Sequence, residues 1–228
     1  MGELSQHHVN GTTLAVITRA PEREVRPPVV LLHGTGDTAA DWNEVATDLR
    51  ADRTVHAVDL RGHGASAWPG TYSIDLMARD LLELMPRLGD RLDLIGHSLG
   101  GLVACRAIAA GAPEPGRLVL EDVGLLHPRP PATPSRPDGD LAFDWLVVEQ
   151  VRPEIDEPAD HWPQTLAAIT VPTLAIGGGP ASFVPQDHVA ELAALAVQAQ
   201  LVTIDAGHSV HAARPEEYLR EIRHFLDA

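Results

Sequence analysis

Short runs of apolar residues alternate along the chain with longer segments whose apolar positions recur every three or four residues. The run from Val29 to Leu32 follows two prolines and is apolar throughout, which is typical of a central strand buried on both faces. The run at 13–18 follows the turn signal Asn10-Gly11, and we expect it to form an edge strand. Strands are predicted at 13–18, 29–32, 54–58, 91–95, 117–122, 171–176 and 201–204.

The segments between these runs have the spacing of amphipathic helices. Ile74 to Leu88, for example, carries leucine and methionine along one face, as a surface helix of a globular protein does. Helices are predicted at 41–49, 74–88, 101–110, 186–198 and 215–226. This alternation predicts an α/β fold with a mostly parallel sheet, helices on both faces, and reactive loops at the carboxyl ends of the strands.

The alternation is interrupted between Gly124 and Thr170. Several prolines deny a helix to the first part of this segment, and 141–150 is its only convincing helix. We expect one core made of residues 1–123 and 171–228, with 124–170 as a short lid inserted over one end of the sheet.

Composition narrows the class of protein. The chain has 228 residues, 44% of them hydrophobic, which suffices for one substantial core. Its formal net charge is −15 and it contains no lysine, so we expect no nucleic-acid or membrane partner. The amino terminus lacks the pattern of a signal peptide, which predicts a cytoplasmic protein. Cys105 is the single cysteine and excludes an internal disulfide framework.

The candidate chemistry centres on the stretch Gly96 to Gly100, which has the form G-x-S-x-G. A predicted strand precedes it and a predicted helix follows it, which is the context this motif requires. The turn would hold Ser98 in a strained conformation, and the glycines leave room for the adjoining strand and helix. A serine hydroxyl also needs a base, an acid and amide donors for the oxyanion. His208, after the last predicted strand, is the candidate base; the alternative is a surface loop histidine.

Five motifs in order along the chain resemble those of the α/β-hydrolase superfamily, in its small prokaryotic esterase-like branch. They are His33-Gly34 with Trp42 after it, Asp59 to Ser66, Gly96 to Gly101, Val171 to Leu174, and Gly207-His208 ahead of Pro215. The resemblance implies an α/β-hydrolase fold with Ser98 as nucleophile and His208 as general base. It also implies an oxyanion hole formed by the backbone N–H groups of Leu99 and Thr35, with His33 packed behind it.

The sequence departs from this family at the acid, the third member of the triad of nucleophile, base and acid. Many relatives carry aspartate in the loop after Val171 to Leu174, whereas Ala181 stands there in this chain. The family's second solution places the acid after the strand that follows the helix of the motif. That position is Asp122, with Glu121 as the reserve; the alternative for both is a solvated strand end. Asp205 is expected to shape its loop instead.

The predicted lid suggests a substrate class. Between Arg136 and Asp160 it holds eight acidic residues against two arginines, which is expected to disfavour anionic substrates. The expected pocket residues are Gly34, His97, Phe143, Trp145, Leu146 and Trp162. Core packing of the lid is an equally good explanation of its aromatic residues.

The remaining histidines suggest no metal site. His208 and His211 are three residues apart, but no nearby carboxylate or cysteine completes a set of ligands, so we expect no metal and no cofactor. His7 and His8 are interpreted as part of a frayed terminus. The sequence carries no indication of the oligomeric state.

The predicted function is a serine hydrolase that cleaves a neutral, moderately apolar ester, lactone or thioester through an acyl-enzyme, with a small molecule as its only predicted partner. Carbon–carbon bond hydrolysis or cofactor-free perhydrolysis on the same fold is the first alternative. A non-catalytic binding or signalling protein with a degenerate triad is the second.

Overall fold

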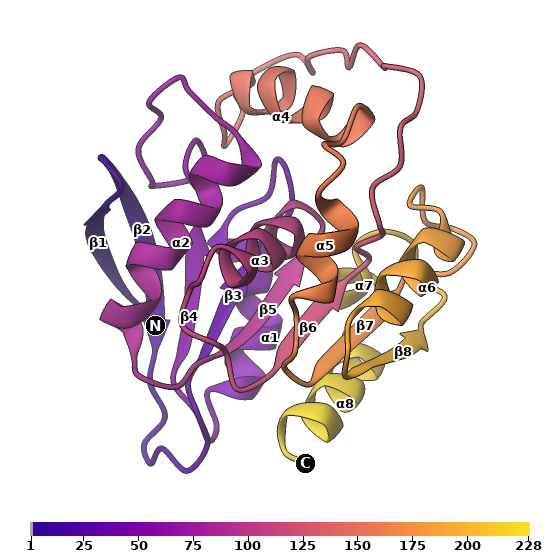
Figure 1. The fold of residues 1–228 in the computed structure, drawn as a ribbon. Coiled ribbons are helices and arrows are strands. Elements are labelled where there is room, and N and C mark those ends of the chain that lie inside the picture. The colour runs from indigo at the N-terminus through magenta and orange to yellow at the C-terminus, as the bar shows by residue number, and fades with distance from the viewer. Residues whose placement is uncertain (1) are drawn as a thin grey trace.

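A computed structural model describes residues 2–228 and contains one eight-stranded sheet (Figure 1). The strand order is β1-β2-β4-β3-β5-β6-β7-β8; β1 and β2 are antiparallel to their neighbours, and the strands from β4 to β8 are mutually parallel. The strands are β1 (Glu3–Val9), β2 (Thr12–Arg19), β3 (Val29–Leu32), β4 (Val55–Asp59), β5 (Asp93–His97), β6 (Leu118–Glu121), β7 (Thr173–Gly177) and β8 (Ala199–Thr203). The predicted α/β architecture is confirmed.

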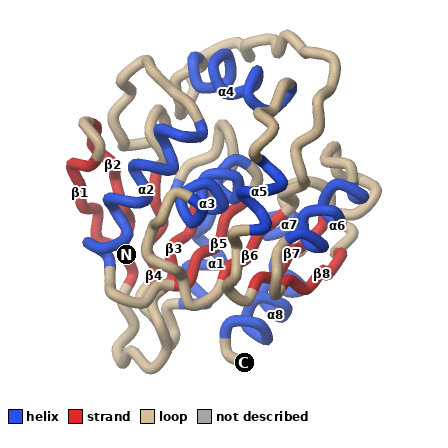
Figure 2. The backbone as a smooth tube through the Cα atoms, viewed as in Figure 1, coloured by secondary structure: helices blue, strands red, loops and turns tan. Residues whose placement is uncertain are grey.

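Helices cover both faces of the sheet (Figure 2). They are η1 (Ala39–Trp42), α1 (Asn43–Leu49), α2 (Ile74–Leu88), α3 (Leu99–Ala109), α4 (Leu146–Asp156), α5 (Trp162–Ala167), α6 (Gln186–Leu195), α7 (Val210–Ala213) and α8 (Pro215–Leu226). Side chains of α2, α3, α5 and α6 fill the core on one face, and those of η1, α1 and α8 fill the core on the other. Within residues 2–228, no helix combines the length and the apolar character needed to cross a bilayer.

The edge of the sheet differs from the prediction. Residues 13–18 lie inside β2, between β1 and β4, and β1 is the edge strand. His7 and His8 belong to β1 and pair with Leu14 and Thr13, so their interpretation as a frayed terminus is wrong. β1 was missed because an edge strand that is mostly exposed carries little apolar pattern. The two-residue turn at Asn10-Gly11, which joins β1 to β2, has positive φ at both positions, as this hairpin type requires.

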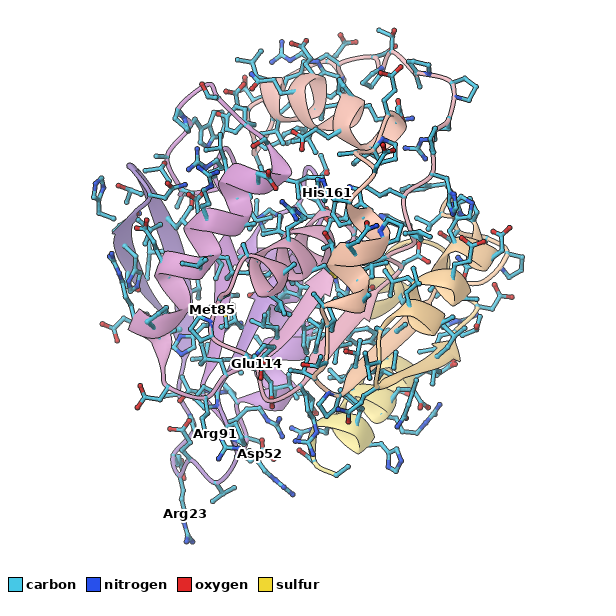
Figure 3. All side chains as sticks on the ribbon, in the orientation of Figure 1. Arg23, Asp52, Met85, Arg91, Glu114 and His161 are labelled. Carbon is cyan, nitrogen blue, oxygen red and sulfur yellow. The ribbon has the colours of Figure 1, made fainter. Side chains whose placement is uncertain are left out.

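Residues 124–170 leave the sheet after β6 and return at β7. The predicted helix at 141–150 lies instead at Leu146–Asp156, and α5, which packs against α3, was not predicted. α4 stands above the carboxyl ends of the strands, apart from the other helices (Figure 1). Figure 3 shows His161, the residue before α5, where the chain descends from α4 toward the sheet. Tyr72 ties this segment to the core, since its hydroxyl donates to Asp144 at 2.7 Å.

Candidate active site

Ser98 occupies a sharp turn between β5 and α3. Its φ of 49° and ψ of −117° lie in a region that L-residues rarely adopt. Close packing explains the glycines around it. A Cβ on Gly96 would lie 2.6 Å from the Cα of Gly101, and one on Gly100 would lie 2.6 Å from the carbonyl carbon of Leu32. The backbone therefore presents Ser98 at the carboxyl end of a central strand.

His208 and Asp122 meet above the same edge of the sheet. Asp122 directly follows β6, and His208 lies in the loop between β8 and α7. Nδ1 of His208 is 2.7 Å from Oδ2 of Asp122. An ionised carboxylate only accepts hydrogen bonds, so Nδ1 carries the hydrogen and Nε2 keeps its lone pair. Both side chains line the cavity that Ser98 also lines.

The loop after β7 supports Asp122 without supplying a carboxylate. Oδ1 of Asp122 accepts from the backbone N–H of Gly178 at 2.8 Å and from Nε2 of Gln186 at 3.1 Å, and the hydroxyl of Ser182 donates to Oδ2. Burial alone would raise the pKa of Asp122, but these bonds and that from His208 outweigh it and hold the pKa below its ordinary value. Sequence reasoning missed Ser182 and Gln186; their position beside Ala181 was the available signal.

Glu121 belongs to a different pair. Its carboxylate accepts from Nδ1 of His211 at 2.8 Å and from the backbone N–H of His211 at 2.9 Å. The His211 ring stacks on Trp42 with ring centroids 4.2 Å apart. Burial would raise the pKa of Glu121, yet the neighbouring His97 and His211 keep it lowered. The reserve acid is thus fully buried against His211 and does not contact His208.

Two neutral histidines hold the loop that follows β3. Nε2 of His33 accepts from the backbone N–H of Leu60 at 3.1 Å, and Nε2 of His63 accepts from that of Gly36 at 3.2 Å. Burial lowers the pKa of His33 to about 4 and that of His63 to about 3. Within residues 2–228 the backbone N–H groups of Thr35 and Leu99 donate to no other group. Both amides are therefore available to a bound oxygen.

His97 connects the turn at Ser98 with two other loops. Its Nε2 is 3.1 Å from the backbone oxygen of His208, and its Nδ1 is 3.5 Å from a carboxylate oxygen of Asp37. Burial would lower the pKa of His97, but the carboxylates of Glu121 and Asp37 outweigh burial and raise it. His97 thereby fixes the backbone of the His208 loop.

A cavity of about 490 Å³ opens at Ser98. Most of its wall is apolar and is supplied by α3, by the loop after β6, by α4 and by the loop after β7. These wall residues are Leu102, Val123, Leu125, Leu126, Val148, Val151, Ile155, Phe183, Val184 and Pro185. The Phe183 ring lies against the His208 ring, tilted by 39° with ring centroids 4.1 Å apart, and Phe183 is 74% exposed. The cavity therefore joins the candidate catalytic groups to an apolar chamber beneath α4.

The lining of this cavity differs from the expected set of pocket residues. His97 lines it, but Gly34 does not, and Trp162 is buried in the core. Phe143, Trp145 and Leu146 line a separate hollow, together with Trp68 and Arg136. The reason is the rotation of α4, which turns Val148, Val151 and Ile155 toward the cavity and leaves Leu146 exposed.

The acidic residues of the insertion do not face the cavity either. None of the eight between Arg136 and Asp160 is in its wall, whereas Arg129 and Arg152 are. The acidic side chains on which the expected repulsion of anionic substrates rested are therefore absent from this wall.

In the part of the chain that the structure describes, neither the cysteine nor any cluster of possible metal ligands adds a reactive group to this site. Burial raises the pKa of the Cys105 thiol to about 12, so this thiol is unreactive at neutral pH. Among residues 2–228, no three histidine, cysteine, aspartate or glutamate side chains are arranged to hold a metal ion.

Comparison with known proteins identifies the family of this chain. Residues 29–221 match the model of the alpha/beta hydrolase family. Esterase YbfF of Escherichia coli (strain K12) is 26% identical, over 88% of this chain and 93% of that protein. The sn-1-specific diacylglycerol lipase ABHD11 of Mus musculus is 27% identical, over 88% of this chain and 81% of that protein.

Solved structures share the fold of this chain. A hydrolase from Pseudomonas aeruginosa PA01 superposes with a TM-score of 0.84 at 25% identity, covering 100% of this chain and 99% of the other. The enol-lactonase from Burkholderia xenovorans LB400 has a TM-score of 0.81 at 22% identity, covering 98% of this chain and 100% of the other. Because the family model spans most of the chain, this protein belongs to the alpha/beta hydrolase family.

Proposed function

We propose that this protein is a serine hydrolase that cleaves a carboxylic ester, lactone or thioester through an acyl-enzyme. Ser98 is the nucleophile, His208 the general base and Asp122 the acid that orients it. The observation that carries the proposal is the 2.7 Å contact between His208 and Asp122 beside a cavity that also contains Ser98. The names of relatives such as esterase YbfF and esterase Rv0045c support the reaction class.

In the proposed mechanism, Nε2 of His208 takes the proton of the Ser98 hydroxyl as its oxygen attacks the substrate carbonyl. The oxyanion accepts hydrogen bonds from the N–H groups of Thr35 and Leu99. His208 then gives its proton to the leaving oxygen or sulfur, and the acyl group remains on Ser98. Water, deprotonated by the same imidazole, releases the acid and restores the serine.

The apolar chamber under α4 supports a moderately apolar acyl or alcohol part. Val148, Val151 and Ile155 would contact it along one side. The expectation of a neutral substrate rested on the acidic lid, and it is not carried over because those acids lie outside the cavity. The hydrogen bond between Asp122 and His208 also favours catalysis over the non-catalytic alternative, whose main support was the alanine at position 181.

Covalent labelling by a fluorophosphonate tests the proposal. Intact mass should show one adduct on the wild type and none on Ser98→Ala. Circular dichroism of both proteins serves as the folding control. A folded wild type that is not labelled, or a Ser98→Ala protein that is labelled equally, would overturn the assignment of the nucleophile.

A further inference from the structure

Two arginines line the part of the cavity formed by the insertion. Arg129 comes from the loop after β6 and Arg152 from α4. Their Nε atoms bind one carboxylate oxygen of Asp156, at 2.5 and 2.7 Å respectively. Asp156 is 1% exposed and also accepts from the backbone N–H of Ala132 at 3.1 Å. The buried carboxylate therefore holds both guanidinium groups in place.

The terminal nitrogens of both arginines remain free for a ligand. Within residues 2–228, each guanidinium is hydrogen-bonded only through Nε, and no group accepts from its two terminal NH₂ groups. The side chains of Arg129 and Arg152 are 42% and 33% exposed, so solvent or a ligand reaches them. The planar fork of an arginine matches a carboxylate in a bidentate geometry.

The charge of this cluster favours a monoanion. Two guanidinium cations share the single carboxylate of Asp156, which leaves one positive charge uncompensated. The acids in the cavity wall are Asp37 and Asp122, and each already lies beside a histidine of the catalytic end, His97 or His208. The acids on the outer surface are screened at physiological salt beyond about 8 Å. A ligand inside the cavity would therefore experience the arginines more strongly than the net charge of −15.

The residues beside the arginines connect them to the reacting centre by an apolar path. Arg152 shares one face of α4 with Val148, Val151 and Ile155, which are all in the cavity wall. A substrate with its ester at Ser98 and an apolar stem along this face would reach the insertion with its far end.

We propose that the substrate carries a carboxylate at the end remote from the scissile bond, bound by the terminal nitrogens of Arg129 and Arg152. This inference rests on the proposed function and specifies its substrate as an ester, lactone or thioester with a distal monoanionic group. A phosphate monoester could use the same arginines, but its second negative charge would have no counterpart in a cluster with one excess positive charge.

The test compares two activated esters that have the same acyl length and differ in charge, p-nitrophenyl hydrogen glutarate and p-nitrophenyl pentanoate. We expect the wild type to have the higher kcat/KM for the charged ester. Arg152→Gln should reduce the ratio of the two kcat/KM values by about tenfold, mainly through KM of the charged ester. Arg152→Lys should restore part of the ratio. Arg136→Gln is the matched control, because Arg136 lines the separate hollow that contains Phe143 and Trp145; this variant should leave the ratio unchanged.

Several outcomes would overturn the inference. One is a wild type that prefers the neutral ester; another is a ratio that Arg152→Gln and Arg136→Gln leave equal to that of the wild type. Thermal melting shows whether Arg152→Gln is folded. If it is not, the ratio of the two kcat/KM values is measured on Arg129→Gln instead. If the wild type is labelled by fluorophosphonate but hydrolyses neither ester, protection of Ser98 by monomethyl glutarate, a monoanion, is measured. Absence of protection rejects the arginine site, and protection weaker with n-propyl phosphate than with monomethyl glutarate supports the carboxylate.

The two proposals fail in different ways. Loss of fluorophosphonate labelling rejects the serine mechanism, whatever the role of the arginines. Normal fluorophosphonate labelling, together with equal kcat/KM values for the charged and the neutral ester, rejects only the carboxylate site.

Discussion

Asp122 and Glu121 are adjacent in sequence but hold different histidines, His208 and His211 respectively. The two acids therefore form a matched pair for mutagenesis. Asp122→Asn should lower kcat by roughly 10³- to 10⁴-fold while the protein stays folded, because an amide no longer fixes the productive imidazole tautomer. Ester hydrolysis and circular dichroism measure the two effects.

The neighbouring variant Glu121→Gln supplies the control. It changes a buried contact with His211 and should lower thermal stability more than it lowers kcat. Wild-type turnover in Asp122→Asn would exclude Asp122 as the acid. A restored carboxylate, Ala181→Asp, should recover part of the lost turnover in the Asp122→Asn background.

Ser182 is expected to act through Asp122. Removing its hydroxyl in Ser182→Ala deletes a hydrogen bond to the carboxylate and should lower kcat by about three- to tenfold with little change in KM. Ser182→Thr keeps a hydroxyl and should recover most of the activity. Equal activity in Ser182→Ala and the wild type would remove Ser182 from the set of positioning residues.

Acidification should destabilise the loop that follows β3. His33 and His63 are neutral in the fold, with pKa values of about 4 and 3, whereas histidines in the unfolded chain take up protons near pH 6.5. The folded-state pKa is lowered, so this stability is complete above pH 6.5 and is lost as the pH falls toward 4. Each histidine should contribute a slope of about 1.4 kcal/mol per pH unit in that window. Urea unfolding between pH 8 and 4.5 measures it.

The matched variant for this pH effect is His63→Gln, whose side-chain amide keeps an acceptor for the backbone N–H of Gly36. Its unfolding free energy should fall less steeply below pH 6.5 than that of the wild type. Identical slopes would mean that His63 is not the titrating group.

Gly100 should be intolerant of any side chain. A Cβ there would lie 2.6 Å from the carbonyl carbon of Leu32, a backbone atom with no freedom to move aside. Gly100→Ala should therefore destabilise the fold by about 2–3 kcal/mol and reduce fluorophosphonate labelling. Gly111→Ala is the control: its Cβ meets nothing within 4 Å, and its φ of 90° should cost about 1 kcal/mol without affecting labelling. Equal losses would contradict the close-packing explanation.

The regular part of the molecule was predictable because each strand and helix carries its own periodic pattern. Val29 to Leu32 is apolar at every position, and its burial in β3 follows directly. β1 was not predictable in this way, because its side chains are mostly exposed and its stability comes from backbone pairing with β2. A strand that pairs with a neighbour on one side only, and whose side chains are mostly exposed, carries little alternation of apolar and polar residues.

In the candidate site, too, the residues that follow a predicted strand were predictable and those held by long-range contacts were not. Ser98, His208 and Asp122 each follow a recognisable strand, so their common edge could be inferred from topology. Ser182 and Gln186 support Asp122 through contacts across 60 and 64 residues, which no local pattern encodes. Phe143 was wrongly assigned to the pocket because its ring stacks on His63, 80 positions earlier in the chain, a tertiary contact that no local pattern encodes.

The carboxylate that binds His208 directly follows β6 and not β7. The loop after β7 contributes Phe183, Val184 and Pro185 to the cavity wall, while the acid that holds His208 comes from elsewhere. Of these three, Phe183 also lies against the His208 ring, with ring centroids 4.1 Å apart. Under the proposed mechanism, the wall positions Val184 and Pro185 can therefore diverge under selection for new substrates while Ser98, His208 and Asp122 stay constant.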